Sequence, residues 1–254
     1  MDQAKLEVKL ENYDTVKYLA EGTFGKVFLV RETQTNSTNQ SNRYLTLKVM
    51  NKNRLNSKGL EGACRHEIEI HSNLVHPNIV RPFEFFEDYI NIYMVFEHME
   101  TTIRDQMLKL LNFRFSEKKA AEIMWSVSSA LAYMHQLGVI HGDIKPERIM
   151  VNSDKRIKLA LKNTTNELNG PKCCTAPELV QGKPFSMHVD LWYMGVLCYE
   201  LINGFKPKID KITYPLWMSD SSKKLIKSLL QTKPDDRKLA SEITKHAWIL
   251  SHVK

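Results

Sequence analysis

Residues 13–50 read YDTVKYLAEGTFGKVFLVRETQTNSTNQSNRYLTLKVM, and three runs within them alternate apolar and polar side chains. Alternation with a period of two is typical of strands that bury one face. The tetrapeptide GTFG and the polar tract QTNSTNQSN separate the runs, as turns and loops do. The stretch therefore predicts three antiparallel strands, YDTVKYLA (13–20), KVFLVRE (26–32) and RYLTLKVM (43–50).

A helix and two more strands are expected to complete this part of the chain. Residues 62–74 place apolar side chains among charged ones at helical spacing, and the helix should end before Pro77. The segments FEFFED (83–88) and NIYMVF (91–96) return to strand character. One helix thus interrupts a small sheet.

The chain changes character after Glu100 and becomes helical. Residues 116–137 carry an apolar stripe, and residues 187–203 are apolar all round, as in a helix buried at the centre of its domain. Residues 221–230 and 240–249 each predict an amphipathic helix. The expected fold class is α+β, with a small β-rich N-terminal lobe that contains one helix and a larger α-helical C-terminal lobe.

Composition narrows the class of protein. The 254 residues are 43% hydrophobic and 26% charged, which excludes general disorder. A formal net charge of +7 predicts attraction to phosphates, acidic partners or nucleic acid, although a solvated basic face would give the same count. The sequence shows no signal peptide or membrane-spanning stretch, and its four cysteines lack metal-ligand spacing. A cytoplasmic or nuclear location and no membrane partner are therefore expected.

Seven short motifs follow one another along the chain. Taken alone, the glycines of GTFG could belong to a simple hairpin turn. The set is more specific, because its members occur in a fixed order. They are LAEGTFGKV (19–27), LTLKV (45–49), HEIEI (66–70), HGDIKPE (141–147), APE (176–178), DLWYMG (190–195) and DDR (235–237).

This order resembles the eukaryotic protein kinase domain, and the wording of residues 65–81 and 189–201 is most like the Aurora branch of Ser/Thr kinases. The resemblance runs from Tyr13 to His252. It implies one two-lobed kinase-like domain over residues 1–254, with 13–99 as the N-lobe and hinge and 100–254 as the C-lobe. It also implies an ATP cleft between the lobes and a peptide groove on the larger one.

The resemblance assigns chemical roles to individual residues. In kinases, glycine N–H groups approach the ATP phosphates, a strand lysine held by a helix glutamate neutralises the α and β phosphates, and an aspartate accepts the substrate hydroxyl proton. Here those residues would be Gly22 and Gly25, Lys48 with Glu67, and Asp143. Lys145 would lie beside the transferred phosphoryl group. Other cofactor-binding positions by the same match are Leu19, Val27, Thr46, Glu97, Met99, Arg148 and Met150.

Structural alternatives stay open for some of these residues, and three further residues match the family only in features of its fold. Lys48 with Glu67 could be a surface ion pair without function, and Asp143 could cap a loop. Glu178 with Arg237 resembles the buried ion pair of the family. Asp190 resembles the helix residue that holds the catalytic-loop backbone.

The sequence departs from the kinase pattern where metal should bind. Kinases hold Mg²⁺ with the Asp of D-F-G and with the Asn of the catalytic loop. Aligning IKLALKN (157–163) and HGDIKPERI (141–149) places Leu161 and Arg148 at those positions, with Lys162 and Asn163 at the Phe and Gly of the motif. A cation at position 148 would repel Mg²⁺, so no metal site is expected. A guanidinium can instead bind phosphate directly, which predicts ATP binding without metal.

Other departures weaken the active arrangement or the peptide groove. Ala20 replaces the first glycine of the loop, and Thr46 replaces the alanine that faces adenine. Gly142 replaces the arginine that pairs with a phosphorylated activation loop, so a phosphate at Thr164 or Thr165 would lack its anchor. Two segments are also short for the family, residues 161–178 and FKPKIDKITYP (205–215).

Five further positions bear on the resemblance or on additional chemistry. Phe96 aligns with the gatekeeper of the nucleotide pocket, ahead of a hinge at residues 97–99, but it is equally a core aromatic at a strand end. His71 shares a helix face with Glu67, where Aurora-like kinases accept a polar residue. We expect His141 to be a packed structural histidine. The vicinal Cys173 and Cys174 are weak candidates for a redox site.

Three functions compete. The leading hypothesis is a pseudokinase that acts by protein binding or allostery, with a partner such as an active kinase or its regulators. The second is an active Ser/Thr kinase with an unusual metal arrangement, in which Glu147 recruits an ion. The third is nonspecific nucleic-acid binding, which lacks a supporting motif. It would use the lysines late in the chain, Lys206, Lys208, Lys211, Lys223, Lys224 and Lys227.

Overall fold

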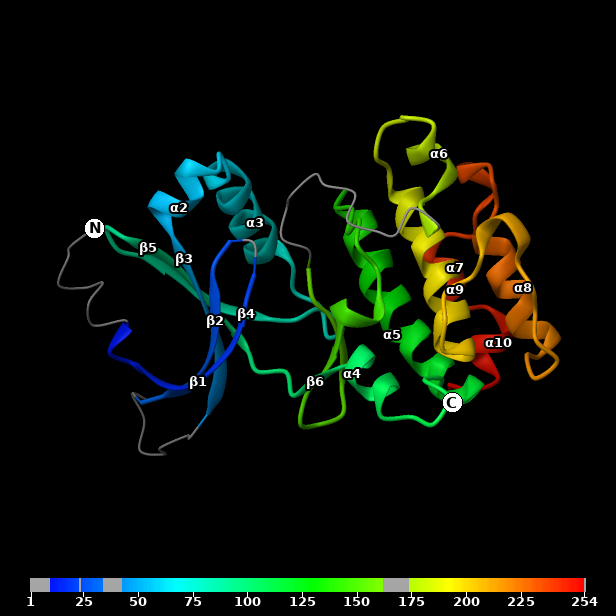
Figure 1. The fold of residues 1–254 in the computed structure, drawn as a ribbon, viewed down its shortest axis with the longest axis horizontal. Helices are drawn as coiled ribbons and strands as arrows, with labels where there is room; N and C mark the ends of the chain where they lie inside the picture. Colours follow the sequence, from blue (N-terminus) through cyan, green and yellow to red (C-terminus); the bar gives the residue numbers. More distant parts are fainter. Residues whose placement is uncertain (1–9, 23, 34–42, 162–173, 254) are drawn as a thin grey trace. The chain divides into compact units, whose positions relative to one another are not determined.

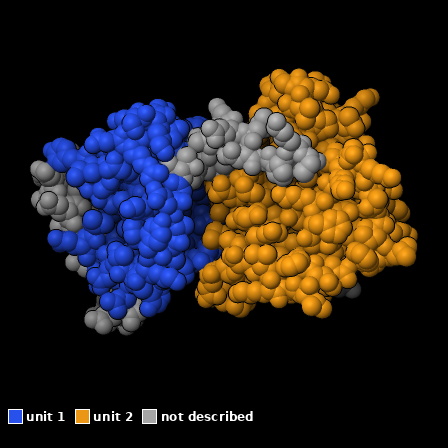
Figure 2. Space-filling model, viewed as in Figure 1, with its two compact units in different colours: residues 1–75, 80–99, 163–166 blue, residues 76–79, 100–162, 167–254 orange. Residues whose placement is uncertain are grey.

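The computed structural model describes residues 10–22, 24–33, 43–161 and 174–253. The chain divides into two compact units, which Figure 2 colours separately. The described part of unit 1 lies within residues 10–75 and 80–99, and that of unit 2 within residues 76–79 and 100–253.

Unit 1 is built on an antiparallel sheet in the order β1-β2-β3-β5-β4 (Figure 1). Its core forms where inward-facing side chains of neighbouring strands meet, among them Val30, Leu45, Phe86 and Val95. The strands are β1 (Tyr13–Glu21), β2 (Lys26–Glu32), β3 (Tyr44–Asn51), β4 (Pro82–Glu87) and β5 (Asn91–Glu97). All five confirm the strands expected from alternation.

Among the described residues of unit 1, the helices α2 (Lys52–Ser57) and α3 (Glu61–Asn73) accompany this sheet. Helix α3 corresponds to the helix expected at residues 62–74, and it buries Glu67 on its inner face. Helix α2 was not foreseen from the sequence. It starts because the Asn51 side chain accepts a hydrogen bond of 3.0 Å from the Arg54 N–H.

Unit 2 is mainly helical. Helix α5 (Glu117–Gln136) packs against α7 (Met187–Asn203), which in turn packs against α8 (Asp220–Leu229). The other helices are α4 (Ile103–Leu108), α6 (Pro177–Val180), α9 (Ala240–Ile243) and α10 (Ala247–Leu250), with short 3-10 helices η1 (Pro146–Arg148), η3 (Ile209–Lys211) and η4 (Pro234–Asp236). Within the described residues, no helix is both long and apolar enough to cross a membrane.

A three-stranded antiparallel sheet completes unit 2. It consists of β6 (Thr101–Thr102), β7 (Ile149–Val151) and β8 (Ile157–Leu159). Residues 76–79 also belong to unit 2, where Ile79 forms a parallel bridge to Leu159. The unforeseen strands are two or three residues long, too short to show a periodic pattern in sequence.

The α+β class is confirmed, with a β-rich unit followed by a helical one, and one helix prediction is wrong. Residues 240–249 do not form one helix but the two four-residue helices α9 and α10. The break falls at His246, whose backbone is extended (ψ 140°) and whose Nδ1 accepts a hydrogen bond from the Trp248 N–H. This cap starts α10 afresh and allows Trp248 Nε1 to donate to Glu117 at 2.8 Å.

Candidate functional site

Lys48 and Glu67 form a buried ion pair in unit 1. Strand β3 carries Lys48 between β2 and β5, and α3 presents Glu67 toward the sheet. Lys48 Nζ lies 2.8 Å from Glu67 Oε1, and the two side chains are only 9% and 3% exposed. This burial argues against the reading of a solvated surface pair. The pair joins β3 to α3 and holds a positive charge at a fixed place.

The glycine-containing loop between β1 and β2 turns inward over this pair. The Gly22 N–H donates to the Gly25 carbonyl at 2.8 Å. A Cβ on Gly25 would lie 2.0 Å from the Val49 carbonyl oxygen, so only glycine fits against β3 there. Phe24 is fully buried, and its ring centroid lies 5.2 Å from Lys48 Nζ. Glu67 and the Phe24 ring therefore both contact the Lys48 ammonium group.

Phe24 is a residue that the sequence analysis did not single out. The only available signal was an aromatic side chain inside a glycine tetrapeptide, a place where turns usually expose their residues. Its burial beside Lys48 means that an anion approaching this ammonium group from the loop side must displace the ring.

The other expected cofactor residues of unit 1 lie on its strands and at the end of β5. Leu19 is 40% exposed on β1, and Val27 pairs with Lys48 across β2 and β3. Thr46 Oγ1 lies 3.3 Å from His98 Nδ1. At the end of β5, the Glu97 carboxylate accepts a 2.6 Å hydrogen bond from the Arg81 N–H, and Met99 is buried.

Phe96 and His71 lie in the core of unit 1. Phe96 is 9% exposed and meets the His71 ring edge-on at a centroid distance of 5.2 Å. His71 Nε2 lies 3.8 Å from Glu67 Oε1. These contacts fit the core-aromatic reading of Phe96. Its alignment with a gatekeeper stays a prediction.

The loop that carries Asp143 in unit 2 is fixed by buried hydrogen bonds. Asp190 of α7 accepts hydrogen bonds from the backbone N–H groups of His141 and Gly142, at 2.9 and 2.7 Å. His141 is 4% exposed, and its ring nitrogens lie 3.2 Å from the Asp143 backbone N and 3.0 Å from the Ala160 carbonyl. Burial lowers the pKa of His141, which keeps the ring neutral. This geometry is that of a packed structural histidine.

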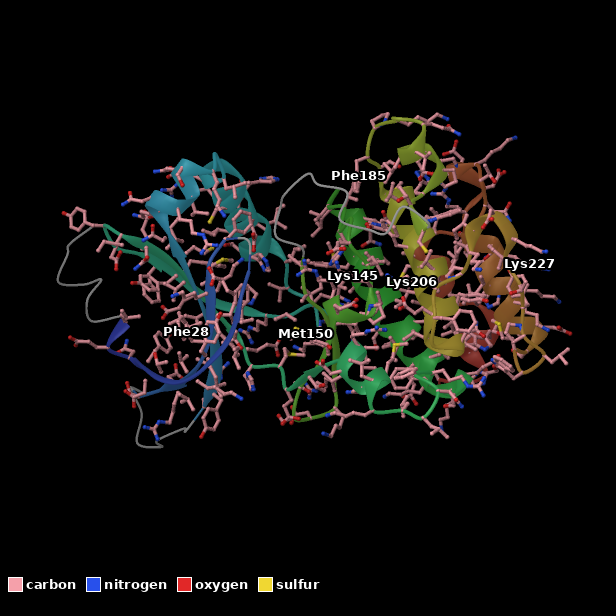
Figure 3. All side chains as sticks on the ribbon, in the orientation of Figure 1. Phe28, Lys145, Met150, Phe185, Lys206 and Lys227 are labelled. Carbon is pink, nitrogen blue, oxygen red and sulfur yellow. The ribbon has the colours of Figure 1, made fainter. Side chains whose placement is uncertain are left out.

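Both carboxylate oxygens of Asp143 are held by cations. Lys145 Nζ lies 2.8 Å from Oδ1, and Arg148 Nε donates to Oδ2 at 2.9 Å (Lys145 is labelled in Figure 3). Burial favours the protonated carboxyl, but the hydrogen bonds from Lys145 and Arg148 outweigh it and lower the pKa of Asp143. A base with a lowered pKa accepts a proton less readily. The arrangement stabilises the carboxylate and leaves it a weak base.

The residues at the expected metal positions do not fit Mg²⁺. Leu161 is an apolar side chain, 9% exposed, and Arg148 is a cation bound to Asp143. Among the described residues, no group of three or more His, Cys, Asp or Glu side chains could hold a metal ion. Mg²⁺ prefers oxygen ligands in octahedral arrangement, which these side chains do not supply.

An aromatic ring packs against position 142, where the family has an arginine and this chain has a glycine. Gly142 has φ of +72°, and a Cβ there would lie 2.8 Å from Cε1 of Phe185, which is labelled in Figure 3. A larger residue would be strained in this conformation and would push against the ring. Lys162, Asn163, Thr164, Thr165 and Cys173 lie outside the described residues.

Four further expected residues are placed within unit 2. Met150 lies on β7 between Thr102 and Lys158. Cys174 is buried, and its thiol donates to the Pro207 carbonyl at 3.5 Å. Glu178 and Arg237 form a bidentate pair, with N–O distances of 2.6 and 2.7 Å, and Arg237 is 3% exposed.

Comparisons with known proteins agree with the motifs that these units carry. A sequence profile of the protein kinase domain matches residues 13–249. Aurora kinase B-A of Xenopus laevis is 33% identical over 275 residues, covering 98% of this chain and 73% of that protein. Aurora/IPL1-related protein kinase 2 of Caenorhabditis elegans is 34% identical over 263 residues, covering 94% of this chain and 83% of that protein. With a profile match over nearly all of its length and relatives of this similarity, the chain belongs to the protein kinase family.

Proposed function

We propose that this chain is a pseudokinase, a protein kinase fold that acts by binding other proteins and does not transfer phosphate. The observation that carries the proposal is the Asp143 carboxylate, both of whose oxygens are engaged by Lys145 and Arg148. A catalytic base must accept the proton of the substrate hydroxyl. Arg148 engages one carboxylate oxygen of Asp143, helps to lower the pKa of that carboxyl group, and at the same time takes the place of a metal ligand.

The catalytic part of the proposal is tested by phosphoryl transfer. Purified protein is incubated with γ-labelled ATP, Mg²⁺ or Mn²⁺, and myelin basic protein as acceptor. We expect any measured phosphate transfer to be the same for the wild type and for Asp143→Asn. Transfer that disappears in Asp143→Asn and in Lys48→Ala would contradict the proposal, since a contaminating kinase would not respond to either change.

Nucleotide binding is proposed to be independent of metal. The family binds ATP, and a guanidinium such as that of Arg148 can bind phosphate directly when Mg²⁺ is absent. Thermal unfolding with ATP in EDTA and in Mg²⁺ tests this. A ligand at about 100 times its Kd stabilises by roughly 2.7 kcal/mol, and about 2–4 °C per kcal/mol makes the shift visible. Equal shifts in both buffers are expected, and a shift with Mg²⁺ alone would contradict the proposal.

One observation favours the second candidate, an active Ser/Thr kinase. The Lys48–Glu67 pair is formed, at 2.8 Å, as phosphoryl transfer in this family requires. Glu147, the carboxylate that would recruit a metal ion, instead lies 3.8 Å from Arg104. The transfer assay above decides between the two candidates.

The proposed partner is a protein, such as an active kinase or one of its regulators, in the cytoplasm or nucleus. The curated relatives are named as Aurora kinases, which supports a setting among protein kinases. Nonspecific nucleic-acid binding through late lysines is the weaker alternative. It would show as affinity that falls steeply with salt and is indifferent to sequence.

A further inference from the structure

Large apolar side chains are exposed on unit 2 where the connection from α7 to α8 passes the residues before α5. Phe113, Phe205 and Trp217 are 48%, 53% and 56% exposed, and Leu216 is completely exposed. The guanidinium of Arg114 lies 4.5 Å from the Trp217 ring centroid. We call Phe113, Arg114, Phe205, Leu216 and Trp217 the basic aromatic surface.

Contacts between the two segments make this one surface. The Trp217 indole N–H donates to Asn203 Oδ1 at 3.2 Å, at the end of α7. Gly204 follows with φ of +83°, and a Cβ there would lie 2.3 Å from the Asn112 carbonyl oxygen. The Phe115 N–H donates to the Leu201 carbonyl at 2.8 Å. Trp217 is therefore held in place from two sides while much of its ring stays exposed.

Two features of the backbone at this surface are unusual. Phe113 has φ of +54°, a left-handed conformation that an aromatic residue rarely adopts, and its ring remains 48% exposed. Strain of about 1–3 kcal/mol of this kind tends to occur at functional sites. The connection 204–219 is long, and within it the structure assigns only the 3-10 helix η3. Connections of such length are usually functional when they are ordered.

Positive charge is concentrated in the same two segments. Residues 108–116 and 203–231 contain eight basic and two acidic side chains, a net +6 of the +7 carried by the whole chain. Lys227 on α8, labelled in Figure 3, lies 5.4 Å from the Tyr214 ring centroid. Burial raises the pKa of Glu200, and the nearby charge of Lys206 partly opposes that shift. A second copy of this chain would meet like charge here, which disfavours self-association.

We infer that the basic aromatic surface is a docking site for an acidic segment of a partner protein that also carries apolar side chains. This rests on the proposed function, because a pseudokinase acts through its protein partners. Arginine and tryptophan that are already held in position are typical of the residues that dominate protein interfaces. Acidic side chains on the partner would complement the surrounding lysines and arginine.

The same features disfavour two other occupants. Nucleic-acid bases would stack on open ring faces, which Phe113 and Phe205 offer, but Arg114 already lies over the largest ring, that of Trp217. A lipid surface would take up Trp217 with its indole N–H toward the headgroups, whereas that N–H is bound to Asn203. Both occupants are included as outcomes of the test.

The probe is a fluorescein-labelled peptide of four Glu-Asp-Leu-Phe repeats, followed by fluorescence anisotropy with the full chain at 150 mM salt. The test variant is Leu216→Ser with Trp217→Ala. The matched control is Tyr89→Ser with Ile90→Ser, which removes exposed apolar side chains (80% and 59%) from unit 1. A peptide of four Glu-Asp-Gly-Ser repeats measures charge alone. Thermal unfolding of each variant shows whether it is folded, and Leu216→Ser alone serves if the double variant is not.

We expect the Leu-Phe peptide to bind at least tenfold more tightly than the Gly-Ser peptide. The test variant should weaken its binding at least tenfold, and the control variant less than twofold. The inference is overturned if the Leu-Phe peptide does not bind, if both peptides bind equally, or if the test variant binds normally. It is also overturned if oligo-dT or phosphatidylserine vesicles bind as tightly as the Leu-Phe peptide does and their affinity falls by the same factor in the test variant.

Failure here can be told from failure of the proposed function. The binding assay contains neither nucleotide nor phosphate acceptor, so a negative result leaves the conclusion about Asp143 in place. Conversely, phosphoryl transfer that depends on Asp143 would remove the pseudokinase proposal and leave the peptide result standing.

Discussion

Two charged clusters of this chain have the same chemistry and different surroundings. In unit 1, Lys48 and Glu67 meet at 2.8 Å with side chains 9% and 3% exposed. In unit 2, Asp143 is 9% exposed, but its partners Lys145 and Arg148 are 28% and 30% exposed. Removing one member of the first pair leaves the other buried charge without that partner. Removing one cation from the second leaves Asp143 with the other.

This difference explains why the two clusters carry different weight as signs of activity. Removing one member of a buried ion pair that joins a strand to a helix destabilises the fold, whether or not the protein transfers phosphate. The presence of Lys48 and Glu67 therefore agrees with an active kinase but does not by itself distinguish it from a pseudokinase. Asp143 is more informative, because its surroundings decide whether it can act as a base. The comparison is open to direct tests.

The largest expected effect comes from breaking the buried pair on one side. Lys48→Met leaves Glu67 buried without its cation, and loss of one partner from such a pair costs about 3–5 kcal/mol. Urea unfolding measures the change. Lys145→Met is the matched control and should cost at most about 1 kcal/mol, since its pair is partly exposed.

A double variant sharpens this prediction. Lys48→Met combined with Glu67→Leu replaces the pair by apolar groups, which is often neutral for a buried ion pair. The double variant should therefore recover most of the stability lost in Lys48→Met. If it is no more stable than Lys48→Met, the loss comes from packing and the pair is not what joins β3 to α3.

Phe24 tests whether the Lys48 charge is available to an anion. Phe24→Ala removes a ring that contacts Lys48 at 5.2 Å and should raise the affinity for ATP in EDTA about tenfold, or about 1.4 kcal/mol. Isothermal titration calorimetry measures it. Phe24→Tyr keeps the ring and should bind as the wild type does. An unchanged or lower affinity in Phe24→Ala would show that the ring does not compete with phosphate.

Restoring metal ligands should have a smaller effect. Arg148→Asn combined with Leu161→Asp returns the two oxygen-bearing side chains that the family uses for Mg²⁺. We expect the Tm of this variant with ATP to rise by about 2 °C or more when Mg²⁺ replaces EDTA, while the wild type does not respond. A variant that ignores Mg²⁺ would indicate that the metal is excluded by more than these two residues.

Much of the fold followed from sequence periodicity, and the exceptions have physical causes. The strands of unit 1 and the long helices α5, α7 and α8 repeat their pattern over six residues or more. Short elements such as α2 and β6 form because of a single capping residue or because of a partner strand far along the chain. The break before α10 is of this kind, because a hydrogen bond within 246–248 and the burial of Trp248 decide it.

The candidate site was only partly predictable for the same reason. Alignment could place Arg148 at a metal position, but it gave no sign that Arg148 binds Asp143. The burial of Phe24 and its contact with Lys48 depend on how tightly a glycine loop folds against β3. Pairings between side chains in a loop follow from its backbone conformation, and the motif letters do not encode that conformation.

The smallest expected effect is a shift in the titration of Asp143, and it isolates the role of Arg148. Arg148→Gln removes one of the two cationic donors, so burial counts for more and the pKa of Asp143 should rise toward its ordinary value of about 3.9. A carboxyl group whose pKa is lower in the folded than in the unfolded protein stabilises the fold at pH values above the unfolded pKa. That stabilisation is lost as the pH falls through the folded pKa. The variant should therefore lose stability at a higher pH than the wild type.

Carboxyl ¹³C NMR of Asp143 follows the titration, and acid unfolding gives the matching stability curve. Arg156→Gln, a change to another arginine of unit 2, should leave both curves unaltered. If Arg148→Gln leaves the Asp143 pKa unchanged, Lys145 alone holds the carboxylate. The loss of basicity would then come from a lysine that the catalytic motif of this family already contains, and Arg148 would no longer support the proposed lack of phosphoryl transfer.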